Sequence, residues 1–479
     1  MNPTNQNPEK PTRNAENSIE SVQHTEIPLA GGGFVLVLNT HAQIGPESEA
    51  MLQALHSRSI GGIKSHLKVL AAKGPENFMA NFYVGYGHKS IGDCGTCTMF
   101  IEGVSMLVAK AIQDFPLYSG QEASTRYIDF AKQNFIDPVG TVESKAILED
   151  WRAFYLRGLE ILIADLQMRF PRGTNEDEKI YLKAIKARAF DIMRGFLPSG
   201  ASTNLAWHSN FRQAADHLMR LRHHPLAEVR EVAETIETAL KKAYPSSFGH
   251  PKFETTENFN KEWMKNAYYH TAEAGSISAA DFRMSRNNID RNMLTEYKKL
   301  LQERKAKTEL PKELGECGTM QFEFLLDFGS FRDVQRHRAV NQRMPLIVMD
   351  HGFEEWYLSE LPTAFRAEAV EFIAAQKAKI EGLKKAGAGA AQTISKEELQ
   401  YYIPMGFKLP NRITGPLHSL VYLAELRATR FVHTTLRKRA IQIANTLASE
   451  FKNEGLVIHL DSDPDRFDIK RGEHDIVQK

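Results

Sequence analysis

The stretch Gly92-Asp93-Cys94-Gly95-Thr96 recurs later in the chain as Gly315-Glu316-Cys317-Gly318-Thr319, so that Cys317 stands 223 positions after Cys94. An apolar run that is compatible with a helix follows each copy. A repeat of this kind bears directly on the fold, because a chain that contains two related units folds differently from a chain that contains one. The recurrence predicts two related halves.

Two weaker pairs occur in the same order. Phe196-Leu197-Pro198 is echoed by Tyr402-Ile403-Pro404, and Leu218-x-x-Leu221-Arg222 is echoed by Leu423-x-x-Leu426-Arg427. Three ordered pairs favour duplication of one domain followed by changes in loop length. The join is expected in residues 244–260, where two prolines and a glycine are typical of a loop.

Length and composition describe an ordinary soluble chain. At 479 residues it has room for about two to four domains, each with its own hydrophobic core. Charged residues make up 25% of the chain and the formal net charge is +1. No overall field therefore draws the protein to nucleic acid or to an anionic membrane.

The cysteines and the N-terminus bear on the compartment. Three cysteines (Cys94, Cys97 and Cys317) are too few for a disulfide scaffold or a four-thiolate zinc site, and we interpret them as small buried residues rather than as redox centres. No stretch approaches the roughly 18 apolar residues of a membrane helix. The first 26 residues are polar and lack the apolar core of a secretory signal. A cytoplasmic protein is expected.

Periodicity predicts three elements within the two halves. Residues 34–38 read as a buried strand, and residues 146–166 and 365–380 place apolar side chains at helical spacing. The predicted organisation is a disordered tail (1–26), a first domain (27–245), a linker (246–262), a second domain (263–458) and a polar tail (459–479).

Two clusters of side chains have the composition of a binding site. Arg336-His337-Arg338 follows a helix-like apolar run (residues 322–334), and its donors suit a phosphate or an anionic flavin ring, although a solvated basic helix end is the simpler interpretation. Glu122, Ser124 and Arg126 alternate and would project together from an extended loop. Such a set can hold a sugar and its phosphate, and the simpler alternative is a polar turn.

Further arginines flank a loop rich in Gly, Ser and Thr. Arg194 and Arg222 lie on predicted helices on either side of it, with Asn210 and Arg212 between them. Such arginines serve either as ion-pair partners or as anion ligands. A phosphate-binding glycine loop and a zinc-protease motif are both absent from the sequence, and the pair His223-His224 lacks a third ligand, so no metal site is predicted.

Taken in order, these motifs resemble the flavin-dependent thymidylate synthases. The resemblance covers roughly residues 30–245 and, more weakly, residues 310–450. It is carried by Gly87-His88-Lys89-Ser90-Ile91-Gly92-Asp93, Phe100-x-x-Gly103-x-Ser105, Glu122-x-Ser124-x-Arg126-Tyr127, Arg194-x-x-Leu197-Pro198, Asn210-x-Arg212, His217-Leu218 and Leu221-Arg222. The implied fold is α+β, with two tandem domains of this type that each contain an antiparallel sheet with long helices and pack as a pseudo-dimer.

The departures from the family pattern differ between the halves. In the first half, Asp114-Phe115-Pro116 stands where the family has its Arg-His-Arg triplet. The second half keeps the triplet, but Met344, Leu346 and Val348 replace the residues of the nucleotide loop. Complementary loss of this kind implies one active site shared between the two halves.

The resemblance implies a role for individual residues. Those matching flavin-contacting positions are Arg336, His337, Arg338, Ser90, Asp93, Asn210 and Arg212. Those matching positions that hold the nucleotide are Glu122, Ser124, Arg126 and Arg194. Arg222 or Arg427 matches the catalytic arginine that polarises the pyrimidine. In the second half Gln400 stands at the position of Arg194.

The implied activity is FAD-dependent methylation of dUMP to dTMP, with NADPH and methylenetetrahydrofolate as co-substrates. A homodimer would reproduce the four-domain assembly of the family, without nucleic acid or membrane partners. Two alternatives remain open: a divergent flavin enzyme that acts on another pyrimidine nucleotide, and a non-catalytic nucleotide-binding homologue. The sequence does not define the nucleotide, the one-carbon donor or the number of active sites.

Overall fold

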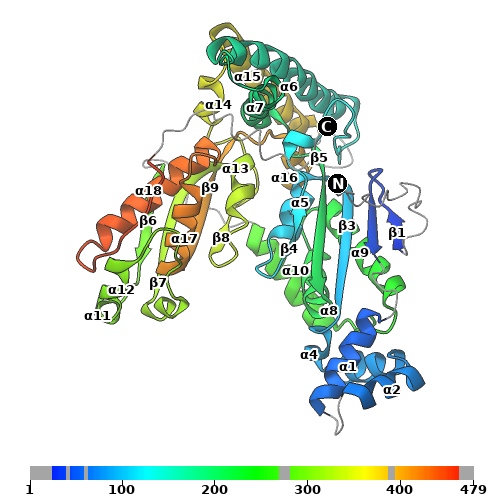
Figure 1. Cartoon of the computed structure of the whole chain (residues 1–479). Helices are drawn as coiled ribbons and strands as arrows, with labels where there is room; N and C mark the ends of the chain where they lie inside the picture. The colour runs from blue at the N-terminus through cyan, green and yellow to red at the C-terminus, as the bar shows by residue number, and fades with distance from the viewer. Residues whose placement is uncertain (1–23, 39–43, 59–62, 269–280, 387–393, 463–479) are drawn as a thin grey trace, which may run out of the picture.

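A computed structural model describes residues 24–38, 44–58, 63–268, 281–386 and 394–462, and all structural statements below concern these residues. Helices pack around two antiparallel sheets, one in each half of the chain (Figure 1). The predicted α+β class is confirmed.

The first sheet has the strand order β1-β2-β3-β5-β4, and every neighbouring pair is antiparallel. Its strands are β1 (His24–Pro28), β2 (Phe34–Leu38), β3 (Thr96–Ser105), β4 (Ser119–Glu122) and β5 (Ser202–Asn210). The predicted strand at residues 34–38 is confirmed as β2. The disordered N-terminal tail predicted for residues 1–26 extends too far. Residues 24–26 belong to β1 and pair with β2, where they gain the ladder hydrogen bonds of a β-hairpin.

The helices of the first half cover this sheet and extend beyond it. Three of them, α5, α8 and α9, pack on the sheet, and the long α6 contains the helix predicted at residues 146–166. The helical segments are α1 (Pro46–Arg58), α2 (Ile63–Lys73), α3 (Glu76–Phe78), the π-helical turn η2 (Met79–Gly85), α4 (Lys89–Gly92), α5 (Met106–Gln113), the 3-10 turn η3 (Thr125–Tyr127), α6 (Val142–Arg169), α7 (Glu178–Met193), the 3-10 turn η4 (Arg194–Phe196), α8 (Phe211–Leu221), α9 (Ala227–Ala243) and α10 (Glu254–Tyr268).

The second sheet has the order β6-β7-β9-β8, which is the order of β2-β3-β5-β4 in the first sheet. Its strands are β6 (Phe282–Asn287), β7 (Thr319–Asp327), β8 (Asn341–Arg343) and β9 (Lys408–Pro416). The expectation of a helix over residues 322–334 is wrong for its first part, because β7 runs to Asp327 and only α13 (Phe328–Val334) is helical. Residues 322–327 (Phe-Glu-Phe-Leu-Leu-Asp) form a short, mainly apolar run that fits a buried strand as well as a buried helix, so periodicity could not decide.

The remaining helices surround the second sheet. The helix predicted at residues 365–380 is confirmed within the longer α15. The segments are α11 (Arg291–Thr295), α12 (Lys298–Glu303), the 3-10 turn η5 (Lys312–Cys317), α13, α14 (Glu355–Ser359), α15 (Thr363–Ala386), α16 (Lys396–Leu399), the 3-10 turn η7 (Gln400–Tyr402), α17 (Leu417–Arg427) and α18 (Thr434–Glu450).

The predicted linker is partly helical. Helix α10 begins at Glu254, inside the stretch expected as a loop, and it packs on α8 of the first half. Glu257 of α10 forms an ion pair with Arg222 at the end of α8, which fastens the helix there. The second domain predicted to start at residue 263 therefore begins inside a helix that belongs structurally with the first half.

A set of reciprocal hydrogen bonds joins the halves. Pro198 and Pro404 form an isolated β-bridge. Around it lie four backbone bonds in two matched pairs: Ser199 N to Ile403 O (2.9 Å) with Met405 N to Leu197 O (2.9 Å), and Gly200 N to Tyr401 O (2.8 Å) with Gly406 N to Gly195 O (2.8 Å). In each matched pair the donor and the acceptor exchange halves, which is the pattern of a local two-fold axis.

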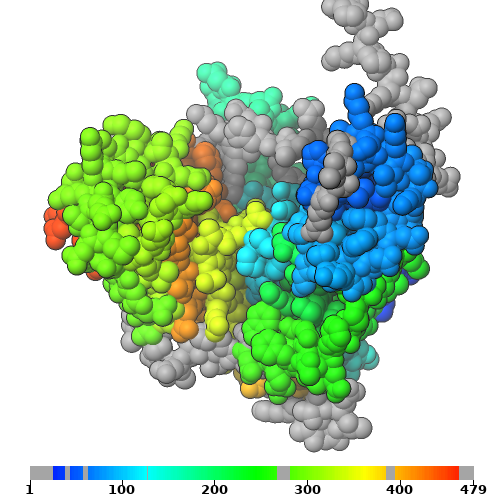
Figure 2. All heavy atoms as spheres, turned by 90° about the horizontal axis from the view of Figure 1, so that it is seen from below, coloured from blue at the N-terminus to red at the C-terminus, as the bar shows by residue number. Residues whose placement is uncertain are grey.

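The long helices form a second contact between the halves. Phe154 of α6 stacks on Phe372 of α15 with ring centroids 4.3 Å apart, and on Phe365 at 5.0 Å. Both helices lie at the top of Figure 1, above the two sheets. Seen from below, the halves lie side by side, with yellow residues of the second half against cyan residues of the first at the centre (Figure 2).

Two of the three cysteines are buried as predicted, whereas Cys94 is partly exposed. Cys97 and Cys317 are buried, all three thiols are free, and burial raises the pKa of Cys97 to about 12. Within the described residues, no group of three His, Cys, Asp or Glu side chains is arranged to hold a metal ion. In the same part of the chain, no helix combines the length and apolarity needed to cross a membrane. Of the predicted polar C-terminal tail, residues 463–479 lie outside the described residues.

Candidate functional site

Glu122 lies where the two halves meet. It ends β4, and its side chain is 3% exposed. One carboxylate oxygen accepts a hydrogen bond from Gln113 Nε2 of α5 (2.8 Å), and the other pairs with Arg332 of α13. This residue, predicted to hold a nucleotide, is thus bound to a helix from each half.

Ser124 and Arg126 do not lie on an extended loop as expected. Ser124 caps the 3-10 turn η3, and its Oγ accepts from Arg126 N (3.4 Å). The turn directs the Arg126 side chain to Asp191 of α7, which it contacts with Nε (3.0 Å) and Nη2 (2.8 Å). The alternation of polar residues suggested one projecting row, but a serine that caps a turn breaks that row.

Arg194 reaches from the first half into the second. It follows the last residue of α7, and its Nη2 donates to Ser330 Oγ of α13 (3.2 Å). Its Nε is buried and has no acceptor among the described residues. Burial works against the charge of this guanidinium, but nearby Tyr357, Asp191 and Asp333 more than compensate and raise its pKa. Arg194 is therefore a permanent cation with an unused donor.

Asp333 is surrounded by arginines and was not selected from the sequence. Its Oδ1 lies 3.7 Å from Arg336 Nε, and Arg194, Arg427 and Arg332 also act on it electrostatically. Burial alone would raise the pKa of this carboxyl, but the four arginines lower it. The available signal was its position three residues before Arg336 at the end of a helix, where the two side chains share a face.

We call these five residues (Asp333, Arg194, Arg332, Arg336 and Arg427) the Asp333 cluster. Arg194 comes from the first half and the others from the second, and Glu122 joins the cluster through Arg332. Arg332, like Arg194, has a buried Nε without an acceptor in the described part of the chain. Unused guanidinium donors at a site with excess positive charge suit a phosphate group.

His337 and Arg427 form one unit beside the cluster. Arg427 Nε donates to His337 Nε2 over 2.7 Å. Burial, assisted by the charge of Arg427, lowers the pKa of His337 to about 3, so the ring is neutral and can accept this bond. The neutral histidine therefore fixes the orientation of the arginine at the end of α17.

A buried polar network holds Ser330, the partner of Arg194. Ser330 Oγ contacts Thr435 Oγ1 (2.6 Å), and Thr435 donates to Asp327 Oδ2 (2.7 Å). Tyr357 donates to the other oxygen of Asp327 (2.8 Å). Since Asp327 and Ser330 are fully buried, this network leaves Ser330 little freedom and so positions Arg194.

A second group of predicted residues lies at another place. Asp93 Oδ1 accepts from Arg212 Nε (2.7 Å), Asn210 caps α8 by accepting from Gln213 N (2.8 Å), and Ser90 lies on α4. Figure 1 shows α4 and α8 at the lower end of the first sheet, whereas α13 lies higher and in the other half. Within the described residues, no hydrogen bond or ion pair joins this group to Arg336, His337 or Arg338.

Arg222 and Arg338 also lie outside the Asp333 cluster. Arg222 donates to Glu257 through Nε (2.8 Å), and this pair lowers the pKa of Glu257 to about 2. Arg338 Nη1 donates to Ser119 Oγ (3.4 Å). Arg222 and Arg427 were expected at equivalent positions of the two halves, but they differ by one residue. Arg427 is the last residue of α17, whereas Arg222 follows the last residue of α8, and the two helices are equally long.

Comparison with known proteins supplies the family context. Residues 45–246 match the model of the family described as thymidylate synthase complementing protein. The UPF0159 protein of Chlamydia muridarum is 26% identical over 416 residues, covering 75% of this chain and 76% of that protein. The UPF0159 protein of Thermoplasma acidophilum is 22% identical over 445 residues, covering 79% and 87%. The similarity to these relatives thus extends beyond the residues that the family model matches.

Proposed function

We propose, on the premise that residues 45–246 form a domain of the thymidylate synthase complementing protein family, that this protein is an FAD-dependent enzyme. It methylates dUMP to dTMP, with methylenetetrahydrofolate as the one-carbon donor and NADPH as the reductant. The site is shared between the halves of the chain. The other pyrimidine nucleotides are the second candidate substrates.

The observation that carries this proposal is the Asp333 cluster and its contact with Glu122. Neither half holds these groups alone, because Glu122 and Arg194 come from the first half and Arg332, Asp333 and Arg427 from the second. The buried, unpaired Nε donors of Arg194 and Arg332 are the groups that would bind the nucleotide phosphate. Ser124, two residues after Glu122, would reach the sugar or the phosphate.

Flavin fits the residues on the outer side of the same cluster. The Arg336 side chain is 57% exposed and therefore accessible to a large cofactor, and the His337 ring beside it is held by Arg427. When bound, FAD supplies the redox chemistry, while the protein supplies orientation and charge. Ser90, Asp93, Asn210 and Arg212 would reach the flavin from a second copy of the chain, and Arg338 from the same copy.

Arg427 is the proposed catalytic arginine. A guanidinium aimed at a pyrimidine carbonyl stabilises the negative charge that develops as the ring carbon becomes nucleophilic. Burial lowers the pKa of Arg427, so this cation is poorly solvated and interacts more strongly with a charge formed next to it. His337 is its positioning residue, because it accepts the hydrogen bond that sets the direction of the side chain.

The test is thymidylate formation by purified protein that has been loaded with FAD. Arg427→Gln should lower kcat by roughly 10²–10³, the typical loss for one group that stabilises transition-state charge. Arg194→Gln should mainly raise the KM for dUMP, because this arginine would contact the phosphate in the ground state as well. The control is Arg157→Gln, an arginine of α6 that is 48% exposed and should leave both constants unchanged.

One observation favours the other candidate functions. Arg126 is committed to Asp191 and Arg222 to Glu257, so two of the arginines expected at a nucleotide already have carboxylate partners. A flavoprotein that converts dCMP or UMP but not dUMP would support the divergent-enzyme alternative. A colourless protein that takes up no FAD and yields no dTMP would contradict the proposal and leave the non-catalytic alternative.

A further inference from the structure

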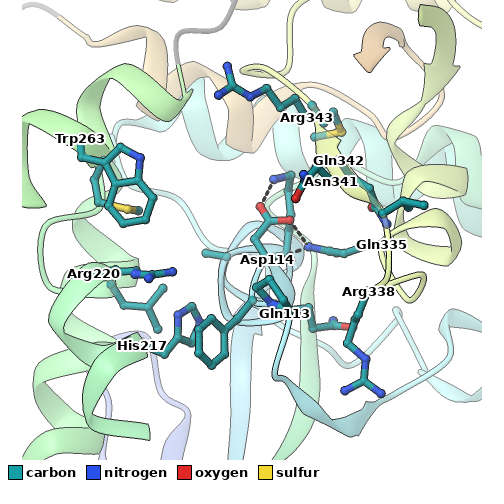
Figure 3. Close-up of a pocket in the computed structure, with 18 residues that line it drawn as sticks. Gln113, Asp114, His217, Arg220, Trp263, Gln335, Arg338, Asn341, Gln342 and Arg343 are labelled. Atoms are coloured by element: carbon teal, nitrogen blue, oxygen red, sulfur yellow. Dashed lines mark hydrogen bonds and ion pairs between the residues drawn. The ribbon is translucent and has the colours of Figure 1, made fainter. Parts of the chain in front are cut away.

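A cavity lies between the halves, apart from the Asp333 cluster. It has a volume of about 320 Å³ and is bounded by α5, α8 and α10 of the first half and by β8 of the second (Figure 3). Its walls include Asp114, Arg220, Trp263, Gln335 and Arg343.

The elements around this cavity are the counterparts of those around the Asp333 cluster. Helix α5 follows β3 as α13 follows β7, and β8 lies beside β9 as β4 lies beside β5. The cavity is thus where a second site would lie, but Asp114 stands there in place of Arg336. Its carboxylate is engaged by Lys110 and Gln335, so it leaves no free negative charge in the wall (Figure 3).

One wall of the cavity is aromatic and carries an arginine. Trp263 of α10 is 40% exposed, and the Arg220 guanidinium lies 4.6 Å from the centre of its ring. On the same side, Phe115 stacks on His217 with ring centroids 4.3 Å apart. Burial lowers the pKa of His217 to about 3, so that ring contributes a neutral surface.

The facing wall carries a second arginine. Figure 3 shows Arg343 on the side of β8, across the cavity from Arg220, whereas Arg338 turns away toward Ser119. Over the described ranges, neither Arg220 nor Arg343 has an ion-pair partner. Arg343 also borders an adjoining hollow that contains Arg286 and Arg412, and Arg412 is paired there with Glu323.

We propose that this cavity is a second, non-catalytic site that binds a nucleoside monophosphate. The planar base would lie against Trp263, and the phosphate would bind Arg220 and Arg343. The site goes beyond the proposed methylation, because Arg338 is the one member of the Arg-His-Arg triplet that lines it and is bound to Ser119, and because the cavity has no equivalent of Asp333. Since α10 forms one wall and connects the halves in sequence, ligand binding there would stabilise the position of that helix.

The experiment uses full-length protein labelled with 5-fluorotryptophan and observed by ¹⁹F NMR. The Trp263 signal is assigned with Trp263→Phe, and the protein is titrated with UMP, uridine and inorganic phosphate separately. UMP should shift the Trp263 signal in a saturable way. Uridine and phosphate should each bind at least about tenfold more weakly, because each makes only part of the contacts.

The matched variants are Arg220→Gln with Arg343→Gln, and the exposed Arg172→Gln as control. The double variant should weaken UMP binding at Trp263 by about tenfold or more at an unchanged melting temperature, and the control should not. A Trp263 signal that stays fixed at millimolar UMP, or that moves equally in the double variant, would overturn the proposal. Because flavin and dTMP formation report on the Asp333 cluster alone, failure here is distinguishable from failure of the proposed function.

Discussion

At the scale of single residues, Glu122 is the most consequential contact between the halves. The Glu122 side chain is 3% exposed and the Arg332 side chain 12% exposed. Both charges have lost most of their contact with water, and each is compensated by the other. Removing one member of a buried ion pair leaves the other uncompensated, which costs far more than loss of a surface pair. Sequence reasoning selected Glu122 as a nucleotide ligand, and the structure adds this structural role.

Glu122→Gln should therefore destabilise the protein by about 3–5 kcal/mol, measured as the free energy of unfolding in urea. Glu368→Gln is the matched control, because Glu368 pairs with Arg157 at a surface where both side chains are nearly half exposed. That change should cost less than about 1 kcal/mol. Equal losses in the two variants would show that the Glu122–Arg332 pair is solvated and does not hold the halves together.

His337 predicts a particular dependence of stability on pH. Its pKa is about 3 in the folded protein, against about 6.5 for an unperturbed histidine. As the pH falls below about 6.5, the unfolded chain takes up a proton that the folded protein refuses, so stability is lost progressively down to about pH 3. At pH values above this window, His337 is neutral in both states and contributes no slope.

His337→Gln keeps an acceptor near Arg427 but cannot titrate. Between pH 5 and 6, its free energy of unfolding should therefore fall with decreasing pH less steeply than that of the wild type, by up to about 1.4 kcal/mol per pH unit. The measurement is a urea titration at several pH values, with His56→Gln, an exposed histidine of α1, as the control. Identical slopes in the His337 variant and the wild type would mean that the folded ring titrates normally.

At the scale of elements, α10 shows what the sequence could not reveal. Two prolines and a glycine indicated a loop over residues 244–260, yet a helix begins at Glu254. Its stability depends on tertiary contacts, since Glu257 binds both Arg222 and His223 of the α8 end. Local composition contains no information about those partners, because they lie more than 30 positions away in the chain.

Removing the charge of Glu257 should loosen α10. In Glu257→Gln, amide hydrogen exchange over α10 should speed up relative to the wild type, while exchange over β3 and β5 stays unchanged. Glu262→Gln, an exposed change on the same helix, should leave exchange close to wild type. Since the pKa of Glu257 is lowered to about 2, the wild type should itself loosen at α10 as the pH falls from about 4.5 toward 2.

Long periodic patterns were predicted well, whereas short apolar runs were predicted correctly at β2 and wrongly at β7. The long helices α6 and α15 follow from spacing alone, because a 3.6-residue period persists over each of them. The strand β2 was predicted from its short, continuous apolar run. β7 was missed because a short, mainly apolar run fits a buried strand and a buried helix equally well. At the site, several residue types were predicted, and the spacing of Asp333 to Arg336 was a local signal that was overlooked. The pairing of Arg126 with Asp191 joins residues 65 positions apart, so no local pattern could predict it.

At the scale of the whole molecule, the two sheets share one strand order and the halves exchange matched hydrogen bonds around Pro198 and Pro404. We propose that the chain arose by duplication and that it packs as a pseudo-dimer. The two reciprocal pairings between the halves then differ: one holds the Asp333 cluster, and the other holds the cavity beside Asp114. One flavin per chain is expected, and two per chain would contradict this division.

The proposed active site also requires a second chain. Within one chain, Arg336 lies in the second half, while Arg212 pairs with Asp93 at the lower end of the first sheet (Figure 1). If both arginines contact one flavin, Arg212 must come from a partner, so light scattering should give twice the 54.2 kDa of the chain. A monomeric mass would exclude this arrangement.

Mixed dimers provide the decisive measurement. Arg336→Ala and Arg212→Ala should each lose flavin as pure proteins, because every site in such a dimer lacks one arginine. In a dimer that contains one chain of each kind, one site lacks both arginines and the other keeps both. Two differently tagged chains, co-expressed and purified through both tags, should therefore bind half as much flavin per chain as the wild type, read from absorbance at 450 nm. If each flavin were bound within a single chain, both sites of the mixed dimer would stay defective, and no flavin would return.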